Sequence, residues 1–261
     1  MIDVTSSTVK AIQEALAQGQ DIPALIQAMK ADSRVSVRKL AQTYMKRMLR
    51  QEAERERLMQ LYSLETVYYN QGIYGIAGVD EAGRGPVAGP VMVAAVILPP
   101  YWECPGLNDS KKVRPEKRDE LYDKIMNEAL AVCCISKSEE EIDELNIYHA
   151  AQAGMYEAVA GLQRPAEVVL ADAMPLPDLT VPHEAIIHGD AKSASIAAAS
   201  IIAKVTRDRV MVEYDKQYPQ YGFAIHKGYL TQRHIDAIRE YGPCPIHRRS
   251  FEPIKSMVEK A

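Results

Sequence analysis

The sequence contains few aromatic residues, few cysteines and no long hydrophobic run. Aromatic residues make up 7% of the 261 residues. The four Cys residues include no C-x-x-C pair, so neither a disulfide framework nor a zinc site is expected. The longest apolar stretches, Val87 to Leu98 and Ile196 to Ala203, are shorter than the roughly 18 residues of a membrane-spanning helix. Because the first residues also lack a secretory signal pattern, we expect a cytoplasmic protein without a membrane segment.

Charge is nearly balanced over the whole chain but not along it. The formal net charge is −4, from 31 basic and 35 acidic residues, which is not the composition of a protein that binds polyanions over its whole surface. Residues 30–57, however, contain nine basic and four acidic residues. This local excess is compatible with a nucleic-acid contact and equally with a solvated helix.

The first 70 residues have the pattern of a small, separate, all-helical domain. Apolar residues recur at helical spacing over residues 9–29, and residues 44–62 contain neither Gly nor Pro. Turn residues follow near Gly72. We therefore predict a helical N-terminal domain over residues 1–70, a possible aid to duplex binding, and a second domain over residues 71–261.

Strand and helix patterns alternate in the second domain. Short apolar runs predict strands at residues 74–79, 87–98, 131–136, 167–171 and 185–188. Longer helical patterns cover residues 115–130, 139–162 and 191–217. This order predicts an α/β domain with a mixed sheet flanked by helices.

Four carboxylates follow three of the predicted strands. Asp80 and Glu81 follow the first strand, Asp172 the fourth and Asp190 the fifth. Ligands of open α/β sheets bind beyond strand ends, which is where these acids are expected to lie. Four carboxylates gathered there would raise each other's pKa unless a cation were present. Oxygen ligands favour Mg²⁺ or Mn²⁺, and two such ions commonly serve phosphodiester hydrolysis. The pattern therefore favours a metal-dependent phosphodiester enzyme.

Each of these acids also has a purely structural interpretation. Asp172 could belong to a turn, and Asp190 could be the N-cap of the Ala-rich helix that follows it. Adjacent strand residues face opposite sides of a sheet, so Asp80 and Glu81 can share a site only if the strand breaks between them. The glycines that follow would permit such a break.

Sequence blocks around these acids resemble ribonuclease HII, the prokaryotic type 2 ribonuclease H. The resemblance opens with GVDEAGRGPVAGPV at residues 78–91 and covers nearly all of residues 73–253. The further blocks, in the family's order, are LNDSKK at 107–112, Asp172, Gly189-Asp190, SIAAASIIAKVTRD at 195–208, YGF at 221–223, HKGY at 226–229 and HRRSF at 247–251. The fold that this resemblance implies is a ribonuclease H-like mixed β-sheet flanked by helices.

The resemblance also implies an activity. Members of that family cut the RNA strand of RNA–DNA hybrids and cut 5′ to a single ribonucleotide in duplex DNA, leaving 3′-hydroxyl and 5′-phosphate ends. We therefore expect a monomeric endoribonuclease that binds hybrids and ribonucleotide-containing duplex DNA and uses Mg²⁺ or Mn²⁺ in a two-metal mechanism. Its catalytic and metal-binding acids would be Asp80, Glu81, Asp172 and Asp190.

Substrate-binding residues are implied in the same way. Gly83-Arg84-Gly85 would read the ribose 2′-hydroxyl at close backbone range, and Tyr229 would stack on the neighbouring sugar at an RNA–DNA junction. Lys111 and Lys112 would contact phosphates, and Asn146 has a counterpart in the family. The structural alternatives are a tight turn for Gly83 and Gly85, a solvated turn for Lys111 and Lys112, and an ordinary half-buried side chain for Tyr229.

The sequence departs from the family pattern in two places. Ala173 stands where many members have Gly, and many members lack the N-terminal 70 residues. The related ribonuclease HIII has a strand-containing N-terminal domain, which this helical segment does not resemble. Two other hypotheses stay open: a ribonuclease H-like nuclease that acts on branched DNA, and a non-catalytic module that binds hybrids.

Overall fold

The computed structural model describes residues 2–19 and 21–259, which divide into two compact units at Arg57 and Leu58. The predicted boundary lies later, near residue 70. The division is earlier because Leu58, Leu61 and Tyr62 are buried in the hydrophobic core of the second unit.

The N-terminal unit is helical, as predicted. It consists of α1 (Val9–Gln18), α2 (Ile22–Ala31) and the first part of α3 (Val35–Leu61). Thr8 caps α1 and Asp21 caps α2 through side-chain oxygens that accept backbone N–H groups. The core of this unit is a small set of buried apolar residues: Val4, Ile12, Leu16, Leu25, Met29, Val37 and Ala41.

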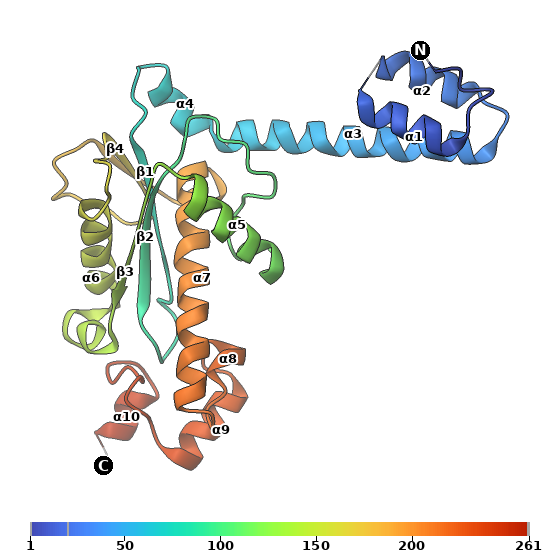
Figure 1. The fold of residues 1–261 in the computed structure, drawn as a ribbon. Helices are drawn as coiled ribbons and strands as arrows, with labels where there is room; N and C mark the ends of the chain where they lie inside the picture. Colours follow the sequence, from blue (N-terminus) through green and yellow to red (C-terminus); the bar gives the residue numbers. More distant parts are fainter. Residues whose placement is uncertain (1, 20, 260–261) are drawn as a thin grey trace. The chain divides into compact units, whose positions relative to one another are not determined.

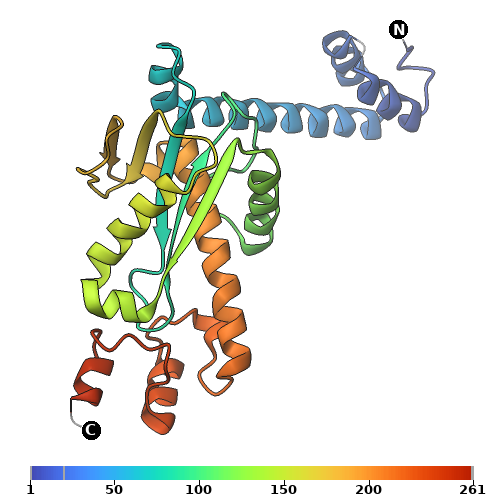
Figure 2. The ribbon, with the colours of Figure 1, turned by 60° about the vertical axis from the view of Figure 1, so that its left-hand side comes forward.

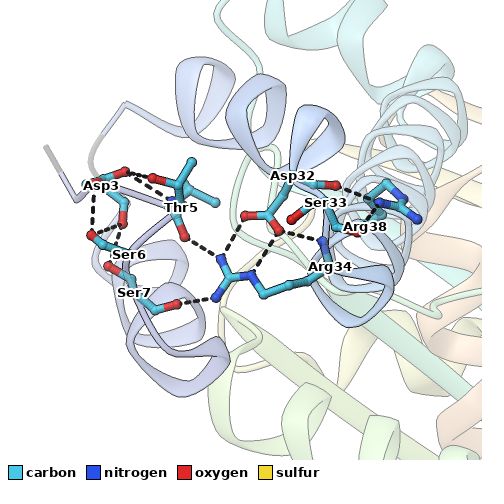
Figure 3. A network of polar contacts seen from close by, with 9 residues as sticks. Asp3, Thr5, Ser6, Ser7, Asp32, Ser33, Arg34 and Arg38 are labelled. Atoms are coloured by element: carbon cyan, nitrogen blue, oxygen red, sulfur yellow. Dashed lines mark hydrogen bonds and ion pairs between the residues drawn. The ribbon is translucent and has the colours of Figure 1, made fainter.

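A polar network around Arg34 joins the start of this unit to the α2–α3 turn (Figure 3). The Arg34 guanidinium pairs with both oxygens of Asp32, at 2.9 and 2.7 Å, and also donates to the carbonyls of Ser7 and Val4. These hydrogen bonds lower the pKa of Asp32 to about 2. Arg34 therefore adds a link from the α2–α3 turn to residues 4–7, whose local hydrogen bonds are those of Thr5, Ser6 and Ser7 to Asp3.

The second unit contains the sheet. Its strands are β1 (Ile76–Ala82), β2 (Val91–Ile97), β3 (Ala131–Lys137), β4 (Val168–Asp172) and β5 (His183–Ile186). Its helices are α4 (Ser63–Tyr69), α5 (Pro115–Glu128), α6 (Glu139–Ala160), α7 (Ala194–Gln217), α8 (Phe223–His226), α9 (Gln232–Tyr241) and α10 (Ile254–Val258), with the short 3₁₀ helix η1 at Gly189–Ala191.

The sheet is mixed, as predicted, with the strand order β3-β2-β1-β4-β5. β1 is antiparallel to β2 and parallel to β4, and β4 is parallel to β5. Helix α6 covers one face, and α5 and α7 cover the other (Figures 1 and 2). Alternate residues of β2 enter the two cores, Val93 on the α6 side and Ala94 on the α7 side. Among the described residues, no helix is both long and apolar enough to cross a bilayer.

Three predicted strands are displaced from those observed. The first continues through Asp80 and Glu81 to Ala82. The second begins only at Val91, because Pro90 and the left-handed Gly89 (φ 86°) interrupt the apolar run that precedes it. The last is His183–Ile186, so residues 187 and 188 lie outside it.

The N-terminal end of helix α7 packs against β1, and Glu65 of α4 contacts the same end of α7. A Cβ on Gly78 of β1 would lie 2.0 Å from the Ser195 carbonyl carbon, so this approach requires glycine. Glu65 is fully buried, and one of its oxygens accepts from the Ser193 hydroxyl at 2.6 Å and from the Ser195 N–H at 2.9 Å. Burial raises the pKa of Glu65. This carboxyl group therefore connects α4 to the first turn of α7.

We expect Glu65→Ala to destabilise the protein by about 1–3 kcal/mol, because two buried donors at the start of α7 lose their acceptor. Glu65→Gln keeps that acceptor oxygen and should cost less. Urea unfolding of both variants measures the difference, and equal losses for Ala and Gln would contradict this role of Glu65.

Candidate active site

Three carboxylates converge at one edge of the sheet. Asp80 lies on β1, Asp172 ends β4, and Asp190 lies in η1. β1 and β4 are parallel, with Val79 opposite Ala171, so Asp80 and Asp172 are neighbours in register. One carboxylate oxygen from each of the three acids lies within 4.8 Å of the others. The N-cap of α7 is Ser193 rather than Asp190, so Asp190 does not have the capping role that was the structural alternative.

This carboxylate cluster is electrostatically unfavourable on its own. Asp80 and Asp190 are only 5% and 6% exposed. Burial, followed by the charges of Glu81 and Asp172, raises the pKa of Asp80 well above its usual range. Burial, followed by Asp109 and Asp172, raises the pKa of Asp190. The geometry therefore disfavours ionised carboxylates unless a positive charge is close by.

Glu81 lies beside the cluster without being one of the three converging acids. The strand break that would let Asp80 and Glu81 share a site is not observed, because β1 continues through both residues. One Glu81 oxygen pairs with Arg84 at 3.2 Å. The other, Oε2, is buried and has no hydrogen-bond partner among the described residues. Burial raises the pKa of Glu81 despite the opposing effect of Arg84.

Two residues of the 107–112 block also reach the cluster. Lys111 is exposed; partial desolvation disfavours its charged form, but Asp80, Asp190 and further carboxylates outweigh this and raise its pKa. Asp109 lies close enough to Asp190 to raise its pKa, and the Asp109 side chain accepts the Lys111 backbone N–H at 2.9 Å. Asp109 was not predicted as a site residue, although it lies inside the LNDSKK block. Lys111 supplies part of the positive charge that the cluster needs.

The donor set fits a hard divalent cation. Every ligand atom is a carboxylate oxygen, the acids repel one another, and Glu81 Oε2 is a buried acceptor without a donor among the described residues. These are the properties of a Mg²⁺ or Mn²⁺ site rather than a zinc site. Asp80, Asp172 and Asp190 would hold such an ion, whereas Glu81 is not one of the converging acids and its role as a metal ligand stays a prediction.

The Gly83-Arg84-Gly85 segment follows β1 directly. Gly83 has a left-handed backbone (φ 103°), and a Cβ there would lie 2.0 Å from Arg207 Nε, so only glycine fits. A Cβ built on Gly85 would lie 3.6 Å from the Tyr229 ring, in ordinary contact. Tyr229 itself is 49% exposed. The structure thus brings Gly85 and Tyr229 together, although 143 positions separate them in the sequence.

A chain of buried histidines holds the backbone at Tyr229. His234 Nδ1 lies 3.0 Å from the Tyr229 carbonyl oxygen, and His234 Nε2 lies 3.0 Å from His247 Nε2. His247 Nδ1 accepts the Cys244 N–H. Burial lowers the pKa of both histidines to about 4, so both are neutral near pH 7. Each contact then has one donor and one acceptor if the protons are on His234 Nδ1 and His247 Nε2.

Two predicted substrate residues have local partners only. Lys112 is exposed and pairs with Asp109 at 3.6 Å. Asn146 interrupts α6 with a left-handed backbone (φ 64°), and its side chain accepts the N–H groups of Tyr148 and His149. It therefore caps the second part of α6, and its contact with substrate stays a prediction. Ala173, where many family members have Gly, also has a left-handed backbone (φ 51°).

Family models match both parts of the chain. The model described as "Ribonuclease HII" matches residues 77–254, and the model described as "Ribonuclease HII N-terminal domain" matches residues 8–69. The chain belongs to the ribonuclease HII family. It is therefore an enzyme of the ribonuclease H type, which hydrolyses RNA paired with DNA. The helical N-terminal segment is thus matched by a family model of its own.

Individual relatives agree with this assignment. The chain is 49% identical over 250 residues to the ribonuclease HII of Bacillus licheniformis, covering 95% of this chain and 98% of that one. It is 46% identical over 253 residues to the ribonuclease HII of Bacillus cytotoxicus, covering 97% of each chain. The crystal structure of ribonuclease H2 from Pyrococcus horikoshii OT3 matches with a TM-score of 0.61 and 27% identity, over 71% of this chain and 97% of that one.

We expect Asp80→Asn to stabilise the metal-free protein at pH 7. The folded state disfavours the ionised Asp80 carboxylate, and the neutral, isosteric amide removes that penalty. Since about 1 kcal/mol shifts the melting temperature of a domain of this size by 2–4 °C, a rise of a few degrees in EDTA should be measurable. Added Mg²⁺ should then stabilise the wild type more than the variant. A lower melting temperature for the variant in EDTA would contradict this account of the cluster.

Proposed function

We propose that this enzyme uses divalent metal ions to hydrolyse the RNA strand of RNA–DNA hybrids and to cut 5′ to single ribonucleotides in duplex DNA. The observation that carries the proposal is the convergence of Asp80, Asp172 and Asp190 beside the segment that brings Gly85 close to the Tyr229 ring. A cluster of acids alone fits many nucleases. Its position next to the exposed Tyr229 ring and the backbone of Gly83 and Gly85 favours an enzyme that makes close contact with one sugar of its substrate.

The residues of the chain have separate tasks in this proposal. Asp80, Glu81, Asp172 and Asp190 would bind Mg²⁺ or Mn²⁺, which would assist deprotonation of the attacking water and stabilise the leaving 3′-oxygen. The Gly83–Gly85 backbone would approach the 2′-hydroxyl, the only group that marks a ribonucleotide within DNA. The products would carry 3′-hydroxyl and 5′-phosphate ends.

Cleavage of two matched duplexes tests the proposal. One contains a single ribonucleotide, and the other is all DNA with the same sequence. We expect metal-dependent cutting of the first only, and no cutting by Asp80→Asn, which should still bind the duplex because the acid holds the ion rather than the DNA. Equal cutting of both duplexes would favour a nuclease of branched or ordinary DNA instead. No cutting of either duplex, or of a hybrid, in Mg²⁺ or Mn²⁺ would favour a binding module.

Tyr229→Ala should lower activity most on the single embedded ribonucleotide. Stacking on a base is worth about 1–3 kcal/mol by alanine substitution. Stacking on a sugar should be at or below the low end of that range, which corresponds to a loss of about fivefold or less in kcat/KM. Tyr229→Phe keeps the ring and is the matched control. An unchanged rate for Tyr229→Ala on this substrate would remove Tyr229 from substrate recognition.

We also propose that the N-terminal domain contacts the duplex and increases the affinity of the enzyme for it. Lys46, Arg47 and Arg50 on α3 are exposed, and among the residues that the structure describes none of them forms an ion pair. Exposed cations without carboxylate partners are available for phosphates, and such contacts weaken as salt rises.

Replacing all three cations by Gln should weaken hybrid binding and reduce the slope of log K against log salt by about 0.9 for each phosphate that the variant no longer neutralises. The matched control replaces Glu52 and Glu56 of the same helix by Gln, which should not weaken binding. An unchanged slope for the triple variant would show that this surface of α3 does not contact the duplex.

A further inference from the structure

Two buried arginines lie beneath the loop that follows β1. Arg207 and Arg248 are 1% and 0% exposed, and neither forms an ion pair within the described part of the chain. Burial lowers the pKa of Arg207 to about 10 and that of Arg248 to about 9, so both remain charged near pH 7. Buried charges are normally paired with an opposite charge, so these two need another explanation.

Backbone carbonyls accept the hydrogen bonds of both side chains, and the nearby Glu139 carboxylate opposes the lowering of both pKa values without forming an ion pair among the described residues. Arg248 donates to the carbonyl oxygens of Gly83 at 2.6 Å, Arg84 at 3.1 Å and Gly89 at 2.9 and 2.7 Å. Its own N–H donates to the Val87 carbonyl. A single guanidinium thus holds both ends of the loop between β1 and β2.

Arg207 holds a different part of the same loop. It donates to the carbonyl oxygens of Pro90 at 2.9 Å, Ala88 at 3.1 Å and Lys227 at 2.9 Å. None of its hydrogen bonds goes to the carbonyls of Gly83 or Arg84. The two arginines therefore divide the loop, and only Arg248 binds the carbonyls of the recognition segment, Gly83-Arg84-Gly85.

The contacts of Arg248 fix the orientation of two successive peptide groups. In a trans peptide the C=O and the following N–H point in opposite directions, and the one cis bond among the described residues is Glu252–Pro253. Because the Gly83 and Arg84 carbonyls point at Arg248, the N–H groups of Arg84 and Gly85 point away from it. Neither N–H has a hydrogen-bond partner in residues 2–19 and 21–259. Two adjacent donors are thus presented on the side of the segment away from Arg248.

We propose that Arg248 is a positioning residue for ribonucleotide specificity: it orients the Arg84 and Gly85 amides so that they donate to the ribose 2′-oxygen and the adjoining phosphate. The inference rests on the proposed function, since it assumes that this segment meets the ribonucleotide. A deoxyribose would leave an oriented donor without its acceptor, and a site built for a hydroxyl rejects analogues that lack it. Arg248 acts through the backbone and does not itself touch the substrate.

Arg248→Lys tests this assignment because it keeps the positive charge but cannot hold three carbonyls in one plane. The measurement is the equilibrium affinity, in EDTA, for a duplex with one ribonucleotide and for the all-DNA duplex of the same sequence. We expect the wild type to prefer the ribonucleotide duplex and the variant to lose about tenfold of that preference, the equivalent of one hydrogen bond, with little change in its affinity for DNA.

Arg207→Lys is the matched control, because it also removes a buried guanidinium, one that packs against Gly83, but leaves the Gly83 and Arg84 carbonyls bound to Arg248. It should keep the preference for the ribonucleotide duplex even if it destabilises the protein. An equal loss of preference in both variants, or a full preference in Arg248→Lys, would overturn the assignment. If the wild type binds both duplexes equally but cuts only the ribonucleotide duplex, this inference fails while the proposed function stands.

A measurement on the wild type covers the case in which Arg248→Lys does not fold. Amide hydrogen exchange at Arg84 and Gly85, followed by NMR, should slow when the ribonucleotide duplex is added and slow less with the all-DNA duplex. Equal exchange of both amides with the two duplexes would overturn the proposal without any substitution.

Discussion

Electrostatic repulsion among buried carboxylates is the constraint on which the rest of this structure depends. Asp80 and Asp172 end up side by side because β1 and β4 are parallel and in register, and the Gly189 N–H, which donates to Asp172 at 2.7 Å, brings the turn of Asp190 to the same place. Burial makes this arrangement costly without a cation, and the core between the sheet and α7 must offset that cost. In the proposed function a divalent ion at this cluster would relieve that cost, so metal binding would couple stability to catalysis.

The carboxylate cluster is a site of buried negative charge, whereas the recognition segment is stabilised by buried positive charges that donate hydrogen bonds to backbone carbonyls. Arg207 and Arg248 bind the loop between β1 and β2 from below, and the His234–His247 pair holds the Tyr229 carbonyl beside it. These contacts are neutral or carbonyl-based, so they add no negative charge next to the carboxylate cluster. These contacts can hold the loop rigid without repelling a bound phosphodiester. A loop held by carboxylates would repel that group electrostatically.

Much of this site was predictable from the sequence, because strand ends and short motifs are local signals. The mixed sheet was predicted, and Asp80, Asp172 and Asp190 are brought together by it. The continuation of β1 through Glu81 was not predicted, because pairing with β2 outweighs the turn tendency of the glycines that follow. The role of Arg248 could not be predicted either, since its carbonyl partners lie more than 150 positions earlier in the chain and are set by packing.

The central claim is that the three converging acids form a cation site. The most direct test is anomalous X-ray diffraction from crystals soaked in Mn²⁺, which locates the metal independently of any activity. The account predicts a Mn²⁺ peak coordinated by oxygens of Asp80, Asp172 and Asp190. Anomalous density that is absent from this cluster in crystals that bind Mn²⁺ elsewhere would contradict it.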